Sequence, residues 1–366
     1  MKQGWEYKRF EACINKTPKP KQVKTEEYNS GTKYPIVSQE DKLISGYYDD
    51  ESYVFHIDSP VVIFGDHTRV LKYIDFDFVV GADGVKIISP KQELNAKFLL
   101  YYLQWYKIPN LGYSRHYKLL KEIQIPLPPK STQLSIVSEL DKISELIRLK
   151  KEQLKDYDNL SQSIFYEMFG DPVENEKGWE VSTYSKCFNI GSGGTPSKSV
   201  PEYWDNGNIP WIGSNMCQNC IITETDGKFI TQEGLNNSST KYLEVGTVLV
   251  ALVGATIGKV ALLRTPTCTN QNVAFIKANE SKDFVPEYVF YNLMGQYEEF
   301  MKIGKGDFKM ANQAFIKALP ILSPPLSLQQ LFAQRIEKIE HQKSEVTKAI
   351  TDLETLLASR MQHWFE

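Results

Sequence analysis

The sequence lacks the features that mark several large classes of protein. Its 366 residues contain no run of about 18 consecutive apolar residues, which a membrane-spanning helix requires. The first six residues hold no apolar core of a secretory signal. Charge of one sign is not in excess, because 42 Lys and Arg stand against 45 Asp and Glu, a net charge of −3. We therefore expect a cytoplasmic protein without a membrane segment, in which any basic DNA-binding surface is local.

Cysteine is sparse as well. The five cysteines cannot all pair within the chain, because their number is odd, and only Cys217 and Cys220 stand close together. A zinc site would need a second such pair or a pair of histidines, and the sequence has neither at a suitable spacing. The pattern predicts reduced thiols and no metal site.

Motifs of the common enzyme classes are also absent. The segment Gly254–Lys259 is one residue too short for a phosphate-binding loop and is followed by Val260. The glycine-rich run at residues 191–194 lacks the GxGxxG spacing of a dinucleotide site. There is no HExxH, no GxSxG and no Asn-Pro-Pro-aromatic motif. We expect no catalytic residue and no cofactor on this chain.

The chain does contain an internal repeat. Gly-Trp-Glu at residues 4–6 recurs at residues 178–180, and each Trp is followed eight residues later by a cysteine. A Pro-Pro pair is followed four residues later by Gln133 in the first copy and by Gln329 in the second. The offset between copies grows from 174 to 196, so the second globular segment is about 22 residues longer. The repeat predicts globular segments 1–127 and 174–322, each followed by a helical segment, 128–173 and 323–366.

Each helical segment carries apolar residues at alternating three- and four-residue steps. Such a sustained seam predicts a coiled coil, and two helices that each follow their own globular segment are expected to pair antiparallel about a pseudo-twofold axis. The residues expected to pair the helices are Leu140, Ile143, Ile147, Leu154, Tyr157, Ile164, Ile336, Ile339, Val346, Ile350, Leu353 and Leu357. Polar residues interrupt the seams at Lys150, Ser161, Lys343 and Arg360. They either extend to solvent at the edges or fix the register of the pair.

Both globular segments read as mixed α/β. In the first, apolar runs predict strands at residues 60–65, 76–81 and 84–88, and an aromatic-rich amphipathic pattern predicts a helix at 96–106. In the second, strands are predicted at 246–251 and 258–263, and the matching helix at 286–299.

Basic residues gather in the loops of both segments, among amide and aromatic residues. Lys and Arg can contact phosphates, and Asn, Gln and Arg can read base edges. Charged loops can also be merely solvated, and the Gly and Asn residues can simply shape turns. The candidate DNA-binding residues are Lys19, Lys21, His67, Thr68, Arg69, Lys86, Arg115, His116, Tyr117, Thr195, Ser197, Lys198, Thr256, Lys259, Asn270, Gln271, Asn272, Lys305 and Lys309.

The order of these motifs resembles the specificity (S) subunit of type I restriction–modification systems, over essentially the whole chain. The doubled Pro-Pro-x3-Gln connectors and the long helices after them are like that family. The matching segments are Gly194–Ser197, Tyr203–Trp204, Ile209–Ile212, Gly246–Leu249, Gly254–Gly258 and Asn270–Asn272 in the second unit, and Ile63–Arg69 and Val80–Lys86 in the first.

This resemblance implies a non-catalytic subunit in a system of phage defence. Two target-recognition domains would each read one half of a split, asymmetric site on double-stranded DNA. Two modification (methyltransferase) subunits, which bind S-adenosylmethionine, would dock on the helices, and restriction subunits would use ATP and magnesium for translocation and cleavage. Two other interpretations stay open: a repeat-built scaffold that binds proteins, and a fused enzyme with an unrecognised nuclease or hydrolase site.

Overall fold

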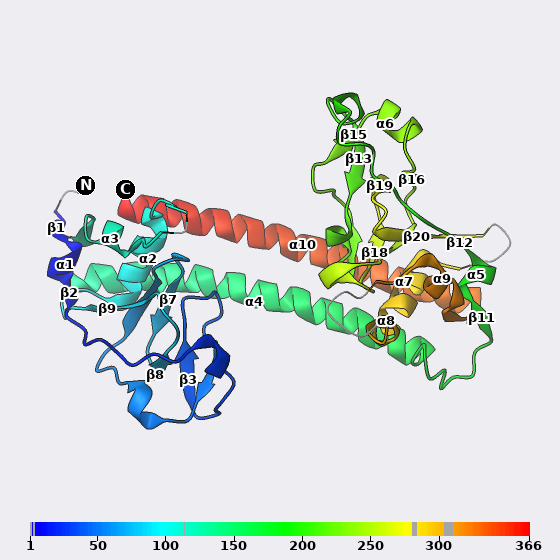
Figure 1. Cartoon of the computed structure of the whole chain (residues 1–366). Helices are drawn as coiled ribbons and strands as arrows, with labels where there is room; N and C mark the ends of the chain where they lie inside the picture. Colours follow the sequence, from blue (N-terminus) through cyan, green and yellow to red (C-terminus); the bar gives the residue numbers. More distant parts are fainter. Residues whose placement is uncertain (1, 3, 113, 280–283, 304–309) are drawn as a thin grey trace. The chain divides into compact units, whose positions relative to one another are not determined.

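A computed structural model (Figure 1) describes the chain except residues 1, 3, 113, 280–283 and 304–309. The chain divides into two compact units: unit 1 is Met1–Glu152 with Val346–Glu366, and unit 2 is Gln153–Glu345. No helix in the described part of the chain is both long and apolar enough to cross a membrane.

Unit 1 contains three small sheets and one well-formed helix beside them. The sheets have the orders β1-β10, β2-β9-β6-β7 and β4-β3-β8-β5. The elements are β1 (Glu6–Arg9), α1 (Phe10–Cys13), β2 (Ile14–Asn15), η1 (Thr25–Glu27), β3 (Tyr34–Val37), β4 (Gly46–Tyr48), η2 (Glu51–Tyr53), β5 (Val54–Phe55), β6 (Val61–Gly65), β7 (Leu71–Ile74), β8 (Phe78–Val80), β9 (Val85–Pro90), α2 (Ala96–Tyr106), α3 (Tyr117–Leu120) and β10 (Gln124–Leu127).

Unit 2 has sheets with the orders β11-β21, β12-β20-β17-β18-β14 and β15-β13-β19-β16. Its elements are β11 (Val181–Thr183), α5 (Tyr184–Cys187), β12 (Phe188–Ser192), η3 (Pro201–Tyr203), β13 (Ile209–Ile212), η4 (Ser214–Met216), β14 (Cys220–Ile222), β15 (Phe229–Ile230), α6 (Gln232–Asn236), β16 (Tyr242–Leu243), β17 (Val248–Ala251), η5 (Gly254–Thr256), β18 (Val260–Leu263), β19 (Thr267–Thr269), β20 (Val273–Ala278), α7 (Pro286–Gly295), α8 (Tyr297–Met301), α9 (Gln313–Ala318) and β21 (Pro320–Leu322).

The two units share one strand topology. In unit 1 the third sheet joins β3 to β8 in parallel and to β4 antiparallel, and in unit 2 β13 joins β19 in parallel and β15 antiparallel. The larger sheet of unit 2 has an added edge strand, β14, which pairs in parallel with β18. Part of the extra length that the sequence offset predicts for the second copy therefore forms this strand.

Two long helices complete the units, α4 (Lys130–Phe169) and α10 (Leu326–Phe365), each of 40 residues. Their ends lie 196 positions apart, so the repeat holds over their full length. Within unit 1, Arg360 bonds Glu139 and Lys151 pairs with Glu354. Within unit 2, Lys343 pairs with Asp158 at 2.7 Å. Because the partner's number falls as the α4 number rises, the helices pair antiparallel, as predicted, in a mixed α/β chain.

The repeated glutamine has the same task in both units. The Gln133 side chain accepts from the Asn95 N–H at the start of α2 and donates to the Pro128 carbonyl, at 2.8 and 2.9 Å. The Gln329 side chain accepts from the Val285 N–H at the start of α7 and donates to the Pro324 carbonyl, at 3.0 and 2.9 Å. Both glutamines are 1% exposed. Each amide therefore ties the start of α2 or α7 to the Pro-Pro connector and satisfies backbone groups that burial would leave unpaired.

The end of each long helix is an aromatic anchor in a globular core. Phe169 of α4 packs edge-on against Tyr288 of α7, with ring centroids 4.8 Å apart, in the core of unit 2. Phe365 of α10 packs against Phe98 and Tyr102 of α2, at 5.5 Å in both cases, in the core of unit 1. Each helix therefore ends in the core of the unit that it does not follow in sequence.

The predicted strands fall on β6, β8, β9, β17 and β18, and the predicted helix at 96–106 is α2. The helix expected at 286–299 is instead two helices, α7 and α8, separated at Gln296. Gly295 ends α7 beside Pro172, where a Cβ would lie 2.6 Å from the proline Cγ. Close packing at this glycine accompanies the break.

Candidate nucleic-acid interface

In unit 1 three of the loops predicted to contact DNA meet at one buried carboxylate. Asp66, which follows β6, is 2% exposed. Its side chain accepts from the Tyr117 N–H at 2.7 Å and lies 3.6 Å from the Lys86 ammonium. Its backbone N–H donates to the Gly84 carbonyl at 2.7 Å. We call the loops at residues 65–69, 83–86 and 115–117, joined in this way, the Asp66 cluster.

Gln39, in the β3–β4 turn, holds two of these loops together. Its side-chain oxygen accepts from the His67 N–H, and its amide donates to the Asp83 carbonyl at 3.0 Å. Its own carbonyl accepts from the Thr68 hydroxyl at 2.6 Å. Neither Gln39 nor Asp66 was among the candidate residues, because neither is basic, although Asp66 lies in the segment Ile63–Arg69 that resembles the family.

Two cations of the cluster reach the surface beside carboxylates. The Arg115 guanidinium lies 3.2 Å from the Asp83 carboxylate, and both side chains are well exposed. The Lys86 ammonium is about one-third exposed and lies 5.8 Å from the centre of the Tyr117 ring. Exposed ion pairs such as Arg115–Asp83 are weak, so Arg115 can leave its carboxylate for a DNA phosphate at small cost. The carboxylate beside Lys86 is buried, so Lys86 is held more firmly.

His116 and Tyr117, two of the candidate DNA-binding residues, make their contacts inside the unit. His116 is fully buried: its Nδ1 bonds the Asp66 carbonyl at 2.9 Å, and its Nε2 accepts from the Leu111 N–H at 3.0 Å. The Tyr117 ring packs on Phe10 and Phe64, and burial raises the pKa of its hydroxyl. In this structure the two residues shape the cluster, because their polar atoms or rings are engaged inside the unit.

The remaining candidates of unit 1 lie apart from these contacts or at their edge. Lys21 donates to the Ser52 hydroxyl at 3.0 Å and lies over the Tyr53 ring. Lys19 is exposed. Arg69 donates to the Ile108 carbonyl at 3.1 Å, which directs it toward α2.

In unit 2 the loops before β13 and after β19 are joined by neutral groups. The Gly194 N–H donates to the Thr269 carbonyl at 2.8 Å, and the Trp211 indole N–H donates to the Gly194 carbonyl at 2.9 Å. The Thr195 hydroxyl donates to the Gln271 side chain at 2.6 Å. Gly193 permits the close approach of this backbone to Thr269, since a Cβ at Gly193 would lie 2.0 Å from the Thr269 carbonyl oxygen.

Asn270 and Asn272 lie in the loop after β19, and Thr256 and Lys259 follow β17. The Asn272 N–H donates to the Asn270 side chain, and the Asn272 carbonyl accepts from the Leu252 N–H in the loop that contains Thr256. Lys259 follows that loop and donates to Gln218 at 2.8 Å.

Ser197 and Lys198 are exposed in the loop after β12. Lys305 and Lys309 lie outside the described residues.

The residues predicted to pair the long helices are all buried or half-buried. Lys343 and Arg360, which interrupt the seams, bond carboxylates on α4 rather than merely reaching solvent, so they can fix the register. Ser161 is buried at 1% exposure. Phe165, Phe169 and Phe332 of the long helices are also buried, and they were not among the predicted pairing residues.

The cysteines lie apart from the candidate contacts. Four of the five are buried and Cys220 is half-buried. Burial raises the pKa of the Cys217 and Cys268 thiols to about 12 and about 11, so they are poor nucleophiles at neutral pH. In the described part of the chain no three His, Cys, Asp or Glu side chains are grouped so as to hold a metal ion.

Comparison with known proteins identifies relatives over almost the entire chain. Residues 2–156 and 176–355 match the family model of the type I restriction modification DNA specificity domain. The specificity subunit of the Escherichia coli type I restriction enzyme EcoR124I/EcoR124II is 24% identical over 346 residues, covering 90% of this chain and 84% of that protein. The MjaIX specificity subunit of Methanocaldococcus jannaschii is 27% identical over 195 residues, covering 52% and 44%.

Solved structures match the fold. The S subunit of a type I restriction–modification system from M. genitalium superposes with a TM-score of 0.57 at 15% identity, covering 99% of this chain and 96% of that one. A chain from a study of complex assembly and conformational transition of the type I R-M system gives 0.56 at 17% identity, covering 100% and 98%. The fold is therefore the one that these chains share.

Proposed function

Because the chain belongs to the family of type I restriction–modification DNA specificity subunits, we propose that its two globular segments each read one half of a split DNA site. The observation that carries this proposal is the pair of units with one topology and different loop chemistry. Unit 1 offers Arg and Lys around a buried carboxylate, and unit 2 offers amides and hydroxyls with Lys198 and Lys259 in the same set of loops. Different donor and acceptor patterns select different bases, so the two half-sites differ.

We infer that this chain performs no chemistry itself. S-adenosylmethionine would be bound by two modification subunits docked on α4 and α10, and ATP with magnesium by restriction subunits. Exposed leucines on these helices, among them Leu146, Leu149 and Leu356, support docking of partner helices or loops. All partners would act on DNA in the cytoplasm.

The test is the methylation pattern of cells that express this chain with a modification subunit. We expect one bipartite motif with an unspecified spacer, read by methylome sequencing. Replacing residues 1–127 with the corresponding segment of another family member should change one half of that motif and leave the other half intact. A change in both halves would contradict the division between the units.

Catalytic inactivity is tested on the purified chain. With S-adenosylmethionine and DNA alone we expect no methyl transfer, and transfer should begin when the modification subunit is added. DNA cleavage by the isolated chain in magnesium would instead identify an enzyme. Equal affinity for all DNA sequences in the full complex would favour a protein-binding scaffold.

A further inference from the structure

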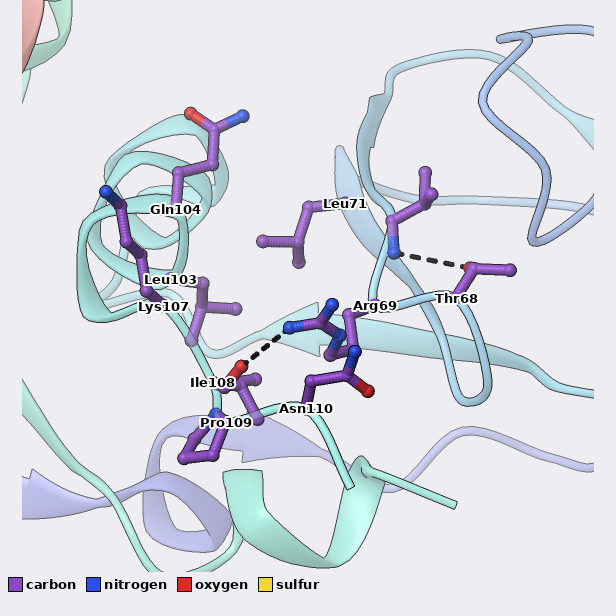
Figure 2. Close-up of a pocket in the computed structure, with 10 residues that line it drawn as sticks. Thr68, Arg69, Leu71, Leu103, Gln104, Lys107, Ile108, Pro109 and Asn110 are labelled. Atoms are coloured by element: carbon purple, nitrogen blue, oxygen red, sulfur yellow. Dashed lines mark hydrogen bonds between the residues drawn. The ribbon is translucent and has the colours of Figure 1, made fainter. Parts of the chain in front are cut away.

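Unit 1 contains a pocket of about 560 Å³ beside the Asp66 cluster, which the reading of bases described above does not use. It lies between the turn from β6 to β7 and the C-terminal end of α2 (Figure 2). Its volume is within the range of small-ligand sites, about 300–1,000 Å³. Leu71, Leu103 and Pro109 provide apolar lining.

The polar lining of the pocket is cationic. Figure 2 shows Arg69 extending from the turn toward Ile108, with Lys107 and Gln104 on the side of α2. One N–H of the Arg69 guanidinium donates to the Ile108 carbonyl at 3.1 Å, which leaves most of its five donors available for a ligand. Lys107 is exposed at the rim. The described residues that line the pocket include no carboxylate, so its charge favours an anion.

Both cations stand on left-handed backbone, with φ of 62° at Arg69 and 48° at Lys107. This conformation is unfavourable for residues other than glycine, and other contacts must hold it. At Arg69 the N–H donates to the Gly65 carbonyl at 2.8 Å, and at the next residue the Val70 N–H donates to the Thr68 hydroxyl at 3.3 Å. The turn thus fixes the point from which Arg69 enters the pocket.

The pocket adjoins one of the loops of the Asp66 cluster. Arg69 is three residues from Asp66, so the loop that closes the pocket is one of the three loops of the Asp66 cluster. A duplex that contacts Arg115 and Lys86 would bring its own backbone near this loop. Cations with an apolar floor suit a phosphodiester and its sugar, which have no base-edge pattern.

We propose that this pocket binds a backbone phosphate of the DNA beside the first half-site, and that Arg69 and Lys107 are phosphate contacts. The proposal rests on the proposed function, since it needs DNA on this face of unit 1. It assigns Arg69 to the positioning of DNA rather than to the choice of base. It also adds Lys107, which sequence reasoning did not select.

The test uses the chain in complex with its modification subunits and the duplex found by methylome sequencing. Lys107→Gln should weaken binding of the specific duplex and of a scrambled duplex by the same factor. The slope of log affinity against log salt should fall by about 0.9, which is about a threefold smaller loss of affinity between about 50 and about 200 mM salt. Arg69→Gln should lower the slope in the same way. Lys91→Gln, an exposed lysine at a different pocket of unit 1, is the matched control and should change the slope less.

A second arm locates the phosphate. Single methylphosphonate groups, which carry no charge, are placed in turn along the duplex beside the first half-site. One position should weaken binding by the wild-type complex and cause no further loss with Lys107→Gln. If Lys107→Gln leaves the slope unchanged, or weakens only the specific duplex, the phosphate assignment is wrong although the proposed function stands. If the wild-type complex shows no sequence preference at all, it is the proposed function that fails.

Discussion

The loops of unit 1 are joined through a buried carboxylate together with the Gln39 side chain, whereas the described loops of unit 2 are joined through backbone groups and neutral side chains. In unit 1, Asp66 binds the backbone of one loop and the Lys86 ammonium of another. In unit 2, Gly193 and Gly194 allow one loop to approach Thr269 directly. Both kinds of loop contact occur on sheets with corresponding strand orders. The comparison teaches that the strand order can stay the same while the loops differ, as the proposed recognition of two different half-sites requires.

The largest expected effect concerns Phe169 and Phe365, the aromatic residues at the ends of the two long helices. Phe169→Ala should destabilise unit 2 by about 3–5 kcal/mol, and Phe365→Ala should destabilise unit 1 by a similar amount, because each removes a buried ring from that unit's core. Hydrogen exchange measures the protection of each unit separately. Phe169→Ala should lower protection in β17 and β20, and Phe365→Ala in β6 and β9. If Phe169→Ala instead lowered protection in unit 1, or Phe365→Ala in unit 2, the assignment of each ring to its core would be wrong.

The next effect separates the two ways of joining loops. Asp66→Ala leaves the half-buried Tyr117 N–H without its acceptor, which should cost about 1–3 kcal/mol in unit 1. Gly193→Ala forces a Cβ against the Thr269 carbonyl and should cost a similar amount, about 1–3 kcal/mol, in unit 2. Denaturant unfolding measures the stability and methylome sequencing the motif.

Each of these variants should relax only its own half of the motif. Asp75→Ala, which removes an exposed carboxylate at the far end of β7 from the Asp66 cluster, is the control and should leave the motif unchanged. If Asp66→Ala relaxed both halves of the motif, the loop contacts of the two units would not act separately.

A third prediction concerns the feature that the units share. Gln133→Ala and Gln329→Ala each remove hydrogen bonds from a buried connector, and each should lower the free energy of unfolding by about 1–3 kcal/mol. The two effects should be nearly equal, since the glutamines bond corresponding groups. A large effect from one and none from the other, measured by denaturant unfolding, would show that the repeat is not equivalent at this position.

The smallest effect is on the pH dependence of the helix pair in unit 1. Hydrogen bonds from Arg360, and then from the Trp364 indole, lower the pKa of Glu139. Its stabilising contribution is therefore complete above its unfolded pKa, about 4.3, and is lost as the pH falls through the lower folded value. Glu139→Gln should lower stability slightly at pH 7 and less in acid, as measured by denaturant unfolding across that pH range. Parallel loss at all pH values would exclude this linkage.

The sequence by itself determined the elements whose signal is periodic. The repeat, the two helices, their antiparallel pairing and the mixed α/β segments could all be predicted, because apolar spacing and the doubled Pro-Pro-x3-Gln connector are local patterns. The glutamines could be selected from that pattern, but their hydrogen bonds to the starts of α2 and α7 could not. The family resemblance added the DNA-binding role.

Only the tertiary structure decided which polar side chains are available to a ligand. His116 and Arg115 are neighbours in a basic loop, yet one is fully buried and the other is well exposed. Gln39, Asp66 and Lys107 acquire their roles from residues or pockets that lie close only after folding. Charge and residue type are visible in a sequence, but desolvation and hydrogen bonding depend on contacts between distant segments, and these decide whether a side chain shapes the reading surface or touches DNA.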